Sequence, residues 1–227
     1  MLARLRLFQV ISPSSPVGGF AYSQGMEWAV ECGWLKTADD VEQWLKGVLD
    51  ESLRYLDLPL IKRMHDAVLS ASPEQFDEWS RYLYVSRETS ELRSEERQRA
   101  EAFYLLLSKL LAEGDEHDDL LHRFQMGARL SQGAGFALAA AKWQLPQDEL
   151  LAGCAWNWLE NSVSAAIKLV PLGQSAGQAL LYEIARMVPD IVDDALGVKD
   201  DELGASSVAL AIASSLHETQ YCRLFRS

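Results

Sequence analysis

The sequence has few cysteines and no long apolar run, and both absences limit where the protein can work. Its 227 residues include three cysteines, Cys32, Cys154 and Cys222, and no C-x-x-C pair. An odd number of widely spaced thiols forms neither a disulfide framework nor a zinc knuckle, and it favours a reducing compartment. No run of about 18 apolar residues is available to span a bilayer. We therefore expect a cytoplasmic protein with no membrane partner.

Several motifs of catalysis and cofactor binding are also missing. The sequence contains neither the phosphate-binding G-x-x-x-x-G-K pattern nor the dinucleotide-binding G-x-G-x-x-G, and it has no H-E-x-x-H zinc motif. The Gly18-Gly19 pair follows Pro13 and Pro16 and precedes no Lys-Ser or Lys-Thr pair, which favours a structural turn. We therefore predict no catalytic residues and no stably bound cofactor.

Basic residues are in the minority. The chain has 33 acidic and 21 basic residues and a formal net charge of -12. Such a surface repels a phosphate backbone, so nucleic acid is a poor partner and a basic protein is a plausible one.

Strand-like patterns are nearly absent, whereas helical periodicity is common. Thr37 and Asp40 have the spacing of a capping box before an amphipathic run, and Ser72 followed by Pro73 predicts another helix start. Residues 148–170 form the longest periodic run, which we expect to be a central buried helix, and residues 4–11 fit either a helix or an edge strand. With no linker long enough to divide the chain, we predict one all-α domain over residues 1–227, a compact bundle of about ten helices without a significant sheet.

Two features carry charge in unusual places. From Arg87 to Glu101, nine of fifteen residues are charged, which is typical of a helix that faces water or a partner. Opposite signs are spaced at i and i+4 in the pairs Arg87/Glu91, Glu95/Arg99 and Arg97/Glu101. Lys168 lies in the last turn of the predicted central helix. Its ammonium could interact with the free carbonyls of the helix end or bind an anionic group of a partner.

Metal binding has weak support. Two groups of possible ligands are close in sequence: His117, Asp118, Asp119 and His122 in one, His217 and Cys222 in the other. Neither has the spacing of a closed site, so the first fits a solvated acidic loop and the second at most a transient contact with a soft metal such as nickel. A rival hypothesis is a metal-binding protein or enzyme whose site assembles from dispersed residues such as Glu27, His65, Glu160 and His217.

The C-terminal segment, residues 217–227, combines aromatic and basic side chains: Tyr221, Arg223, Leu224, Phe225 and Arg226. These residue types are enriched at the centres of protein interfaces. A segment of this kind either docks on a partner and becomes ordered there, or packs against its own domain. Both readings remain open at this point.

Separated segments in the same order along the whole chain resemble the UreF family of urease accessory proteins. These segments are residues 12–30, Asp57-Leu58-Pro59, Arg87-Glu88-Thr89, Glu95-Glu96-Arg97, Trp158-Leu159-Glu160-Asn161, residues 168–174 and residues 217–227. One departure is Cys222, where the family more often has Ser, so no thiol-based nickel role is carried over to it.

The resemblance implies a non-enzymatic, all-α cytoplasmic protein that helps to insert nickel into apo-urease. Members of the family form homodimers, bind the accessory protein UreD, also called UreH, and recruit or modulate the GTPase UreG. We expect a docking tail for UreD/UreH formed by His217, Glu218, Thr219, Gln220, Tyr221, Arg223, Leu224, Phe225 and Arg226. We expect a surface that faces UreG to include Lys168, Arg87, Glu88 and Arg97.

Overall fold

The computed structural model describes residues 1–111 and 115–227, with the side chains of residues 112–118 excluded. Its elements are α1 (Leu2–Ile11), α2 (Met26–Glu31), α3 (Ala38–Val48), the π-helix η2 (Leu49–Asp57), α4 (Leu58–Leu69), α5 (Pro73–Val85), α6 (Ser90–Leu110), α7 (Asp115–Arg123), α8 (Gln125–Ala128), α9 (Gln132–Trp143), α10 (Gln147–Leu169), α11 (Gln174–Ile184), α12 (Val188–Gly197) and α13 (Val208–His217). Short 3-10 turns occur at Gly19–Ala21, Ala185–Met187 and Asp200–Glu202. No strand occurs among the described residues, which confirms the predicted all-α class.

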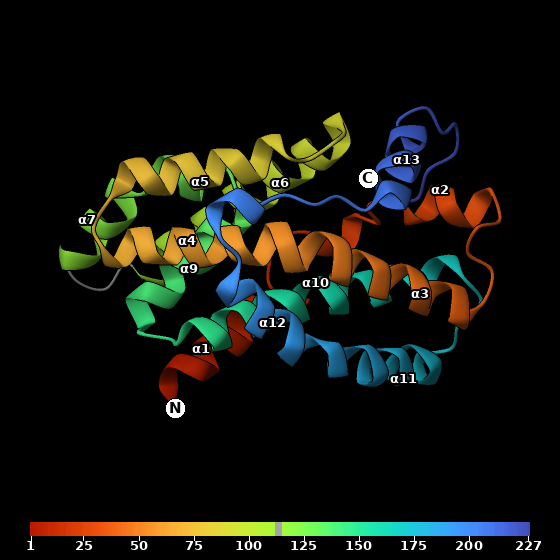
Figure 1. The fold of residues 1–227 in the computed structure, drawn as a ribbon, viewed down its shortest axis with the longest axis horizontal. Coiled ribbons are helices and arrows are strands. Elements are labelled where there is room, and N and C mark those ends of the chain that lie inside the picture. Colours follow the sequence, from red (N-terminus) through yellow and green to blue (C-terminus); the bar gives the residue numbers. More distant parts are fainter. Residues whose placement is uncertain (112–114) are drawn as a thin grey trace.

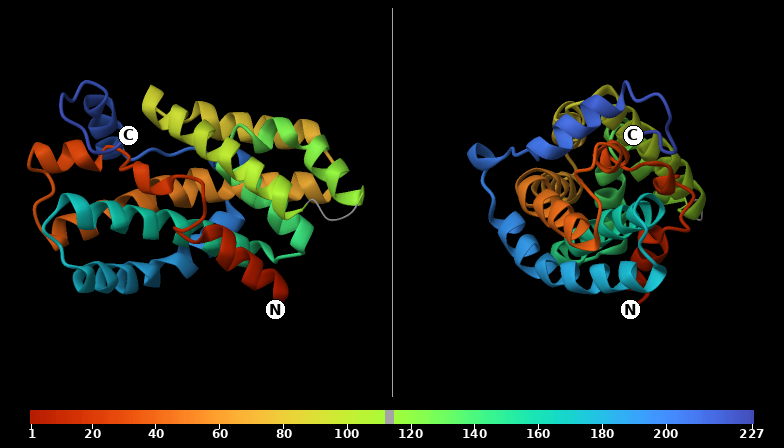
Figure 2. Two further views of the ribbon diagram at one scale, coloured as in Figure 1. Left: turned by 180° about the vertical axis from the view of Figure 1, so that it is seen from behind. Right: turned by 90° about the vertical axis from the view of Figure 1, so that its right-hand side faces the viewer.

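The helices form an elongated bundle around one contiguous core. Figure 1 shows α3 and α4 running as one rod through the middle, with α5 and α6 on one side and α11 and α12 on the other. Apolar side chains from α1 through α13 join the same core. The end-on view in Figure 2 shows these layers enclosing the interior. None of the helices in the described part of the chain is long and apolar enough to cross a membrane.

The predicted central helix is α10. It packs against α1, α4, α9, α11 and α12, and its buried face includes Leu151, Ala155, Leu159 and Val163. Residues 4–11, which periodicity left undecided, belong to α1, because a continuous face of Leu7, Val10 and Ile11 is buried.

Two helix starts test the predicted capping. Thr37 Oγ1 accepts a hydrogen bond from Asp40 N at 3.2 Å, and Asp40 Oδ2 accepts one from Thr37 N at 2.9 Å, which confirms the capping box. Ser72 occupies the N-cap position of α5 with Pro73 in the first turn, which confirms the predicted helix start, although the Ser72 side chain makes no capping hydrogen bond.

Small residues let α9 pack closely between its neighbours. A Cβ at Gly135 would lie 2.5 Å from Phe103 Cδ1 on α6, and one at Gly133 would lie 2.8 Å from Ile61 Cγ1 on α4. Such distances leave no room for a methyl group, which explains why glycine and alanine dominate this segment.

Pro59 shapes the middle of the α3–α4 rod. Proline has no N–H, so it cannot donate to Tyr55 O as an α-helix requires. The backbone widens into the π-helix η2 just before this point, and Tyr55 O accepts a hydrogen bond from Gly204 N at 3.2 Å. Gly204, with a φ of 117°, belongs to the connection between α12 and α13. The connection is thereby held across the rod and leads α13 to the end of the bundle where α2 lies (Figure 1).

Candidate partner-docking surface

The last helix, α13, packs against α2 through a close backbone contact. Gly25, at the start of α2, has a φ of 79°, and a Cβ there would lie 2.6 Å from Ser214 N in α13. Only glycine combines this backbone conformation with this approach. The buried face of α13 consists of Leu210, Ala213, Ser214 and His217.

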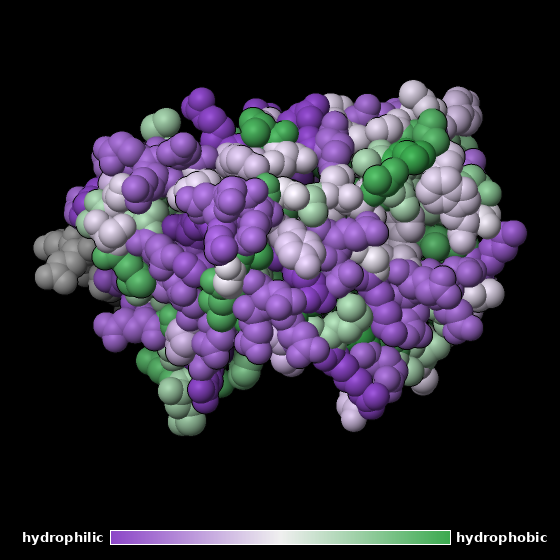
Figure 3. Space-filling model, viewed as in Figure 1, coloured by the Kyte–Doolittle hydropathy of each residue, from purple (hydrophilic) through white to green (hydrophobic). Residues whose placement is uncertain are grey.

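The opposite face of α13 carries an exposed apolar stripe. Val208, Ile212 and Leu216, spaced four residues apart, are 69%, 43% and 42% exposed. Figure 3 shows the corresponding apolar patch at the upper right, over α13. In the segment that follows, Tyr221 is 99% and Leu224 68% exposed. We call these five residues the candidate docking surface. The sequence revealed the spacing of the α13 residues but not that they face outward.

The tail after α13 folds back onto its own domain. The carboxylate of Glu27 in α2 accepts hydrogen bonds from Leu224 N at 2.6 Å and from Phe225 N at 2.9 Å. Ser227 O accepts from both the N and the Oγ of Ser23, each at 2.7 Å. Phe225 is buried, and Lys168 Nζ lies 5.5 Å from the centre of its ring. The tail is therefore held in place before any partner binds.

A buried charge cluster lies where α13 meets the tail. His217 has no exposed surface, and its Nδ1 lies 2.6 Å from Glu91 Oε2 in α6 while its Nε2 lies 3.3 Å from Glu27 Oε2. Arg223 Nη1 donates to the other oxygen of Glu91 at 2.5 Å. The cluster joins α2, α6, α13 and the tail.

The other tail residues have distinct roles. The carboxylate of Glu218 accepts hydrogen bonds from the N and Oγ of Ser90 at 2.8 and 2.6 Å, and so caps α6 from outside the helix. The hydrogen bond from the Ser90 side chain lowers the pKa of Glu218. Thr219 bonds back to α13, and the Gln220 amide donates to Glu31 and to the carbonyl of Cys222. Arg226 is exposed and reaches Gln98.

Arg87 lies in a mostly buried ion network and not on a helix surface. Its guanidinium is 2.5 Å from Asp57 Oδ1 and 2.8 Å from Glu96 Oε2. Glu96 also accepts hydrogen bonds from Ser131 Oγ and Gln132 N, both at 3.0 Å, and so caps α9. Because α6 begins only at Ser90, the predicted helical pair of Arg87 with Glu91 does not form.

Burial and charge oppose each other in this network. Burial raises the pKa of Asp57, and the neighbouring Arg87 only partly offsets it. Burial also works to raise the pKa of Glu96, but the charge and hydrogen bond of Arg87 outweigh it and leave that pKa below its usual range. The two carboxylates raise the pKa of Arg87 despite its burial. Arg87 therefore stays charged and holds three elements together.

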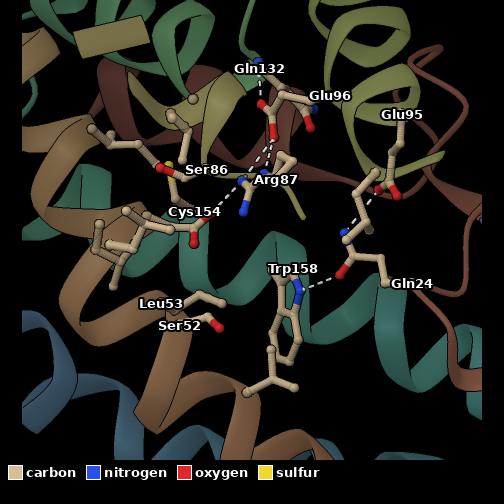
Figure 4. Close-up of a pocket in the computed structure, with 18 of the residues that line it drawn as sticks. Gln24, Ser52, Leu53, Ser86, Arg87, Glu95, Glu96, Gln132, Cys154 and Trp158 are labelled. Atoms are coloured by element: carbon tan, nitrogen blue, oxygen red, sulfur yellow. Dashed lines mark hydrogen bonds and ion pairs between the residues drawn. The ribbon is translucent and has the colours of Figure 1, made fainter. Parts of the chain in front are cut away.

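A pocket of about 100 Å³ lies beside this network. Figure 4 shows Arg87 and Glu96 on one side and Gln24 on the other, where Gln24 reaches between Glu95 and Trp158. Gln24 donates to Glu95 at 3.0 Å and accepts from Trp158 Nε1 at 2.9 Å. Ser227 Oγ donates to the second oxygen of Glu95 at 2.8 Å, so the end of the tail contacts the wall of the pocket.

The remaining residues predicted to face UreG occupy different places. Arg97 is exposed on α6, and Lys168 is exposed in the last turn of α10, where its Nζ lies 3.4 Å from Phe20 O. Glu88 is exposed and accepts a hydrogen bond from Ser206. The predicted pair of Glu95 and Arg99 forms at 2.8 Å, but Glu95 is buried, so this part of α6 does not face water as the charge pattern suggested.

The dispersed metal ligands do not assemble. Glu27 and His217 meet, but His65 contacts Gln147 and Glu160 accepts from Trp156. Among the side chains that the structure describes, no group of three or more His, Cys, Asp or Glu residues is placed to hold a metal ion. The first group of possible ligands lies in α7, so the expected acidic loop was wrong at these positions. The side chains of His117 and Asp118 lie outside the described part, and those of Asp119 and His122 are exposed.

One serine motif also has no catalytic setting. Residues 173–177 read G-x-S-x-G, the spacing of a nucleophile elbow, in which the serine follows a strand. Here the motif opens α11 after a loop, and Ser175 is exposed. The strand and turn that such an elbow needs are therefore missing from this segment.

Comparison with known proteins identifies the family. The UreF family model matches residues 35–185. The urease accessory protein UreF of Alcanivorax borkumensis is 48% identical over 225 residues, which cover 99% of this chain and 98% of that protein. Proteins of the same name from Pseudomonas entomophila and Pseudomonas putida (strain W619) are 46% and 44% identical, covering 100% of this chain and 98% of each relative. The resemblance seen in the sequence is confirmed, and the chain belongs to the UreF family of urease accessory proteins.

Proposed function

We propose that this protein is a cytoplasmic scaffold in the insertion of nickel into apo-urease. Residues 1–227 act as one domain that binds UreD/UreH through the docking surface and recruits or modulates the GTPase UreG. Nickel is the cargo of this assembly, with at most transient contact to the chain. The role in urease maturation follows from the family, and the docking surface supports the more specific role.

The exposed apolar side chains of α13 and the tail carry the proposal. Val208, Ile212, Leu216, Tyr221 and Leu224 lie on one end of the bundle, although α13 has a buried face of its own. Apolar patches of this kind on soluble proteins mark interaction sites, and tyrosine and large apolar residues are frequent at their centres.

The tail presents its side chains from a fixed backbone. The hydrogen bonds of Glu27 to Leu224 N and Phe225 N hold the loop, while the Leu224 and Tyr221 side chains point away from the core. We therefore expect UreD/UreH to bind a preformed surface, in place of the disordered tail considered from the sequence.

The contacts of the residues proposed to face UreG indicate which of them a partner could reach. Lys168 and Arg97 are exposed cations that a GTPase could reach. Arg87 is committed to Asp57 and Glu96, so we expect it to act through the fold. Lys168 also lies beside Phe225, so the proposed UreG-facing surface would adjoin the tail.

A second copy of the chain is proposed to bind where α1, α10 and α12 form an apolar groove of about 540 Å³. Phe8 lies at this groove and is 61% exposed, and Leu2 and Leu5 continue the exposed stripe along α1. A ridge beside a groove is self-complementary under two-fold symmetry, because each copy can place its α1 in the groove of the other.

The experiment is a binding measurement between the full chain and purified UreD/UreH. Ile212→Ser and Leu224→Ser should each weaken binding by about tenfold or more, as interface anchors do. Leu105→Ser on α6 is the matched control, because Leu105 is 50% exposed and lies outside the docking surface. Point variants are preferable to removal of the tail, since removal would also expose the buried carboxylates of Glu27 and Glu91.

Unchanged affinity in both docking variants would contradict the proposal. In a reconstitution of urease activation from purified components, Lys168→Ala should lower UreG recruitment and urease activation while UreD/UreH still binds. Normal UreG recruitment by this variant would remove Lys168 from the GTPase-facing surface.

A further inference from the structure

His217 is fully buried between two carboxylates that approach opposite sides of its ring. Nδ1 lies 2.6 Å from Glu91 Oε2, and Nε2 lies 3.3 Å from Glu27 Oε2. A neutral imidazole has one N–H, so one of these contacts would then place a nitrogen lone pair against a carboxylate oxygen. An imidazolium donates to both. The geometry also disfavours a metal site, because an ion bound at one ring nitrogen would be out of reach of the carboxylate at the other nitrogen.

Each of the two carboxylates also holds the tail. Glu27 accepts the N–H groups of Leu224 and Phe225, and Glu91 binds the guanidinium of Arg223. His217 therefore contacts both groups that fix the loop carrying the Leu224 side chain. The hydrogen bonds of His217 do not reach the exposed apolar residues of the docking surface. We therefore expect His217 to affect docking only through Glu27 and Glu91.

We propose that His217, with both ring nitrogens protonated, is the positioning residue of the docking tail, holding Glu27 and Glu91 in the orientation that fixes residues 223–225. This inference rests on the proposed docking function and adds to it the residue that holds the docking surface in position. The imidazolium also offsets part of the negative charge that the two carboxylates bring into a buried site.

Acidic groups outnumber basic ones around the cluster. The charged groups there are Glu27 and Glu31 from α2, Glu91, Glu95 and Arg99 from α6, Glu218 at the end of α13 and Arg223 from the tail. A ring with a single N–H would leave Glu27 or Glu91 without one donor, so the geometry of the tail requires both N–H groups.

The test measures the tail in the full chain without any partner. Nuclear magnetic resonance of the His217 ring in the folded chain should show two protonated nitrogens. Amide exchange at Leu224 and Phe225, corrected for the intrinsic rate, should be about tenfold faster or more in His217→Gln than in the wild type at the same pH, because hydrogen bonds to charged groups are strong. His122→Gln, at an exposed histidine on α7, should exchange as the wild type does.

A ring with one protonated nitrogen in the folded chain would overturn the inference, as would tail amides that exchange equally in His217→Gln and the wild type. UreD/UreH binding then separates the two proposals. If Ile212→Ser and Leu224→Ser do not weaken binding, the docking function fails whatever the exchange data show. If they do weaken it while His217→Gln binds normally, the positioning role fails and the docking function stands.

Discussion

Replacement of Arg87 by alanine should destabilise the fold strongly. The guanidinium is 2.5 Å from Asp57 and 2.8 Å from Glu96, and the side chains of all three residues are at most 21% exposed. Removing one partner of a buried ion network leaves charges uncompensated and costs about 3–5 kcal/mol. A domain is stable by only about 5–15 kcal/mol, so the loss is a large fraction of the total.

The dependence on pH gives a second check with a definite sign. In the wild type, Glu96 has a lowered pKa, so its contribution to stability is present above the ordinary Glu value of about 4.3 and is lost as the pH falls through the lowered value. Asp57 has a raised pKa, which costs stability as the pH rises above the ordinary Asp value of about 3.9. Without Arg87 both carboxyls should resist ionisation. The difference between variant and wild type should therefore shrink at acid pH.

Urea unfolding of Arg87→Ala and the wild type measures both effects. Arg97→Ala is the matched control on the exposed side of α6, and it should change the free energy of unfolding by no more than about 0.5 kcal/mol. The reasoning is refuted if Arg87→Ala is as stable as the wild type and instead fails to recruit UreG. Arg87 would then be a partner contact, as the sequence alone suggested.

Two further predictions concern the ends of the chain. If the proposed homodimer forms through the α1 groove, Phe8→Asp should be monomeric in sedimentation experiments, while Val85→Asp, at a residue equally exposed at 61%, should remain dimeric; a dimer that persists in Phe8→Asp would exclude the α1 groove as the interface. Glu218→Gln should lower the free energy of unfolding by about 0.3–1 kcal/mol at neutral pH, because the amide oxygen can still accept from Ser90 but no longer places a negative charge at the start of α6. The pKa of Glu218 is lowered, so this contribution of the charge is present above about pH 4.3 and is lost on acidification, and a Glu218→Gln difference that persists well below that pH would contradict the role of the charge.

Local patterns predicted the helices because each depends on neighbours in sequence. The capping box of Thr37 and Asp40 and the periodic face of α10 needed no information from the rest of the chain. The π-helix η2 could not be predicted in this way. Pro59 indicates that the helical hydrogen bond to Tyr55 O is lost. The donor that replaces it is Gly204 N, which is distant in sequence.

The contacts at the candidate site were even harder to predict, because they join residues that are distant in sequence. Spacing alone paired Arg87 with Glu91, whereas Thr89 caps α6 and leaves Arg87 outside the helix, next to Asp57. His217 was considered as a ligand beside Cys222, because the sequence gives no sign that Glu27 and Glu91 would enclose it. The role of His217 and Arg223 in docking stays a prediction, and their contacts come from α2 and α6.

The packed tail changes the energetics expected for docking. Ordering a flexible segment costs about 1–2 kcal/mol for each residue of backbone, which a partner would have to offset for every tail residue it fixes. In this structure Glu27, Ser23 and Glu91 already fix the backbone near Leu224 and Phe225 through contacts within the chain. A partner therefore needs to bury only the exposed side chains of α13 and the tail to bind. By the same argument, weakening the cluster around His217 should reduce affinity for the partner even though the exposed side chains stay unchanged.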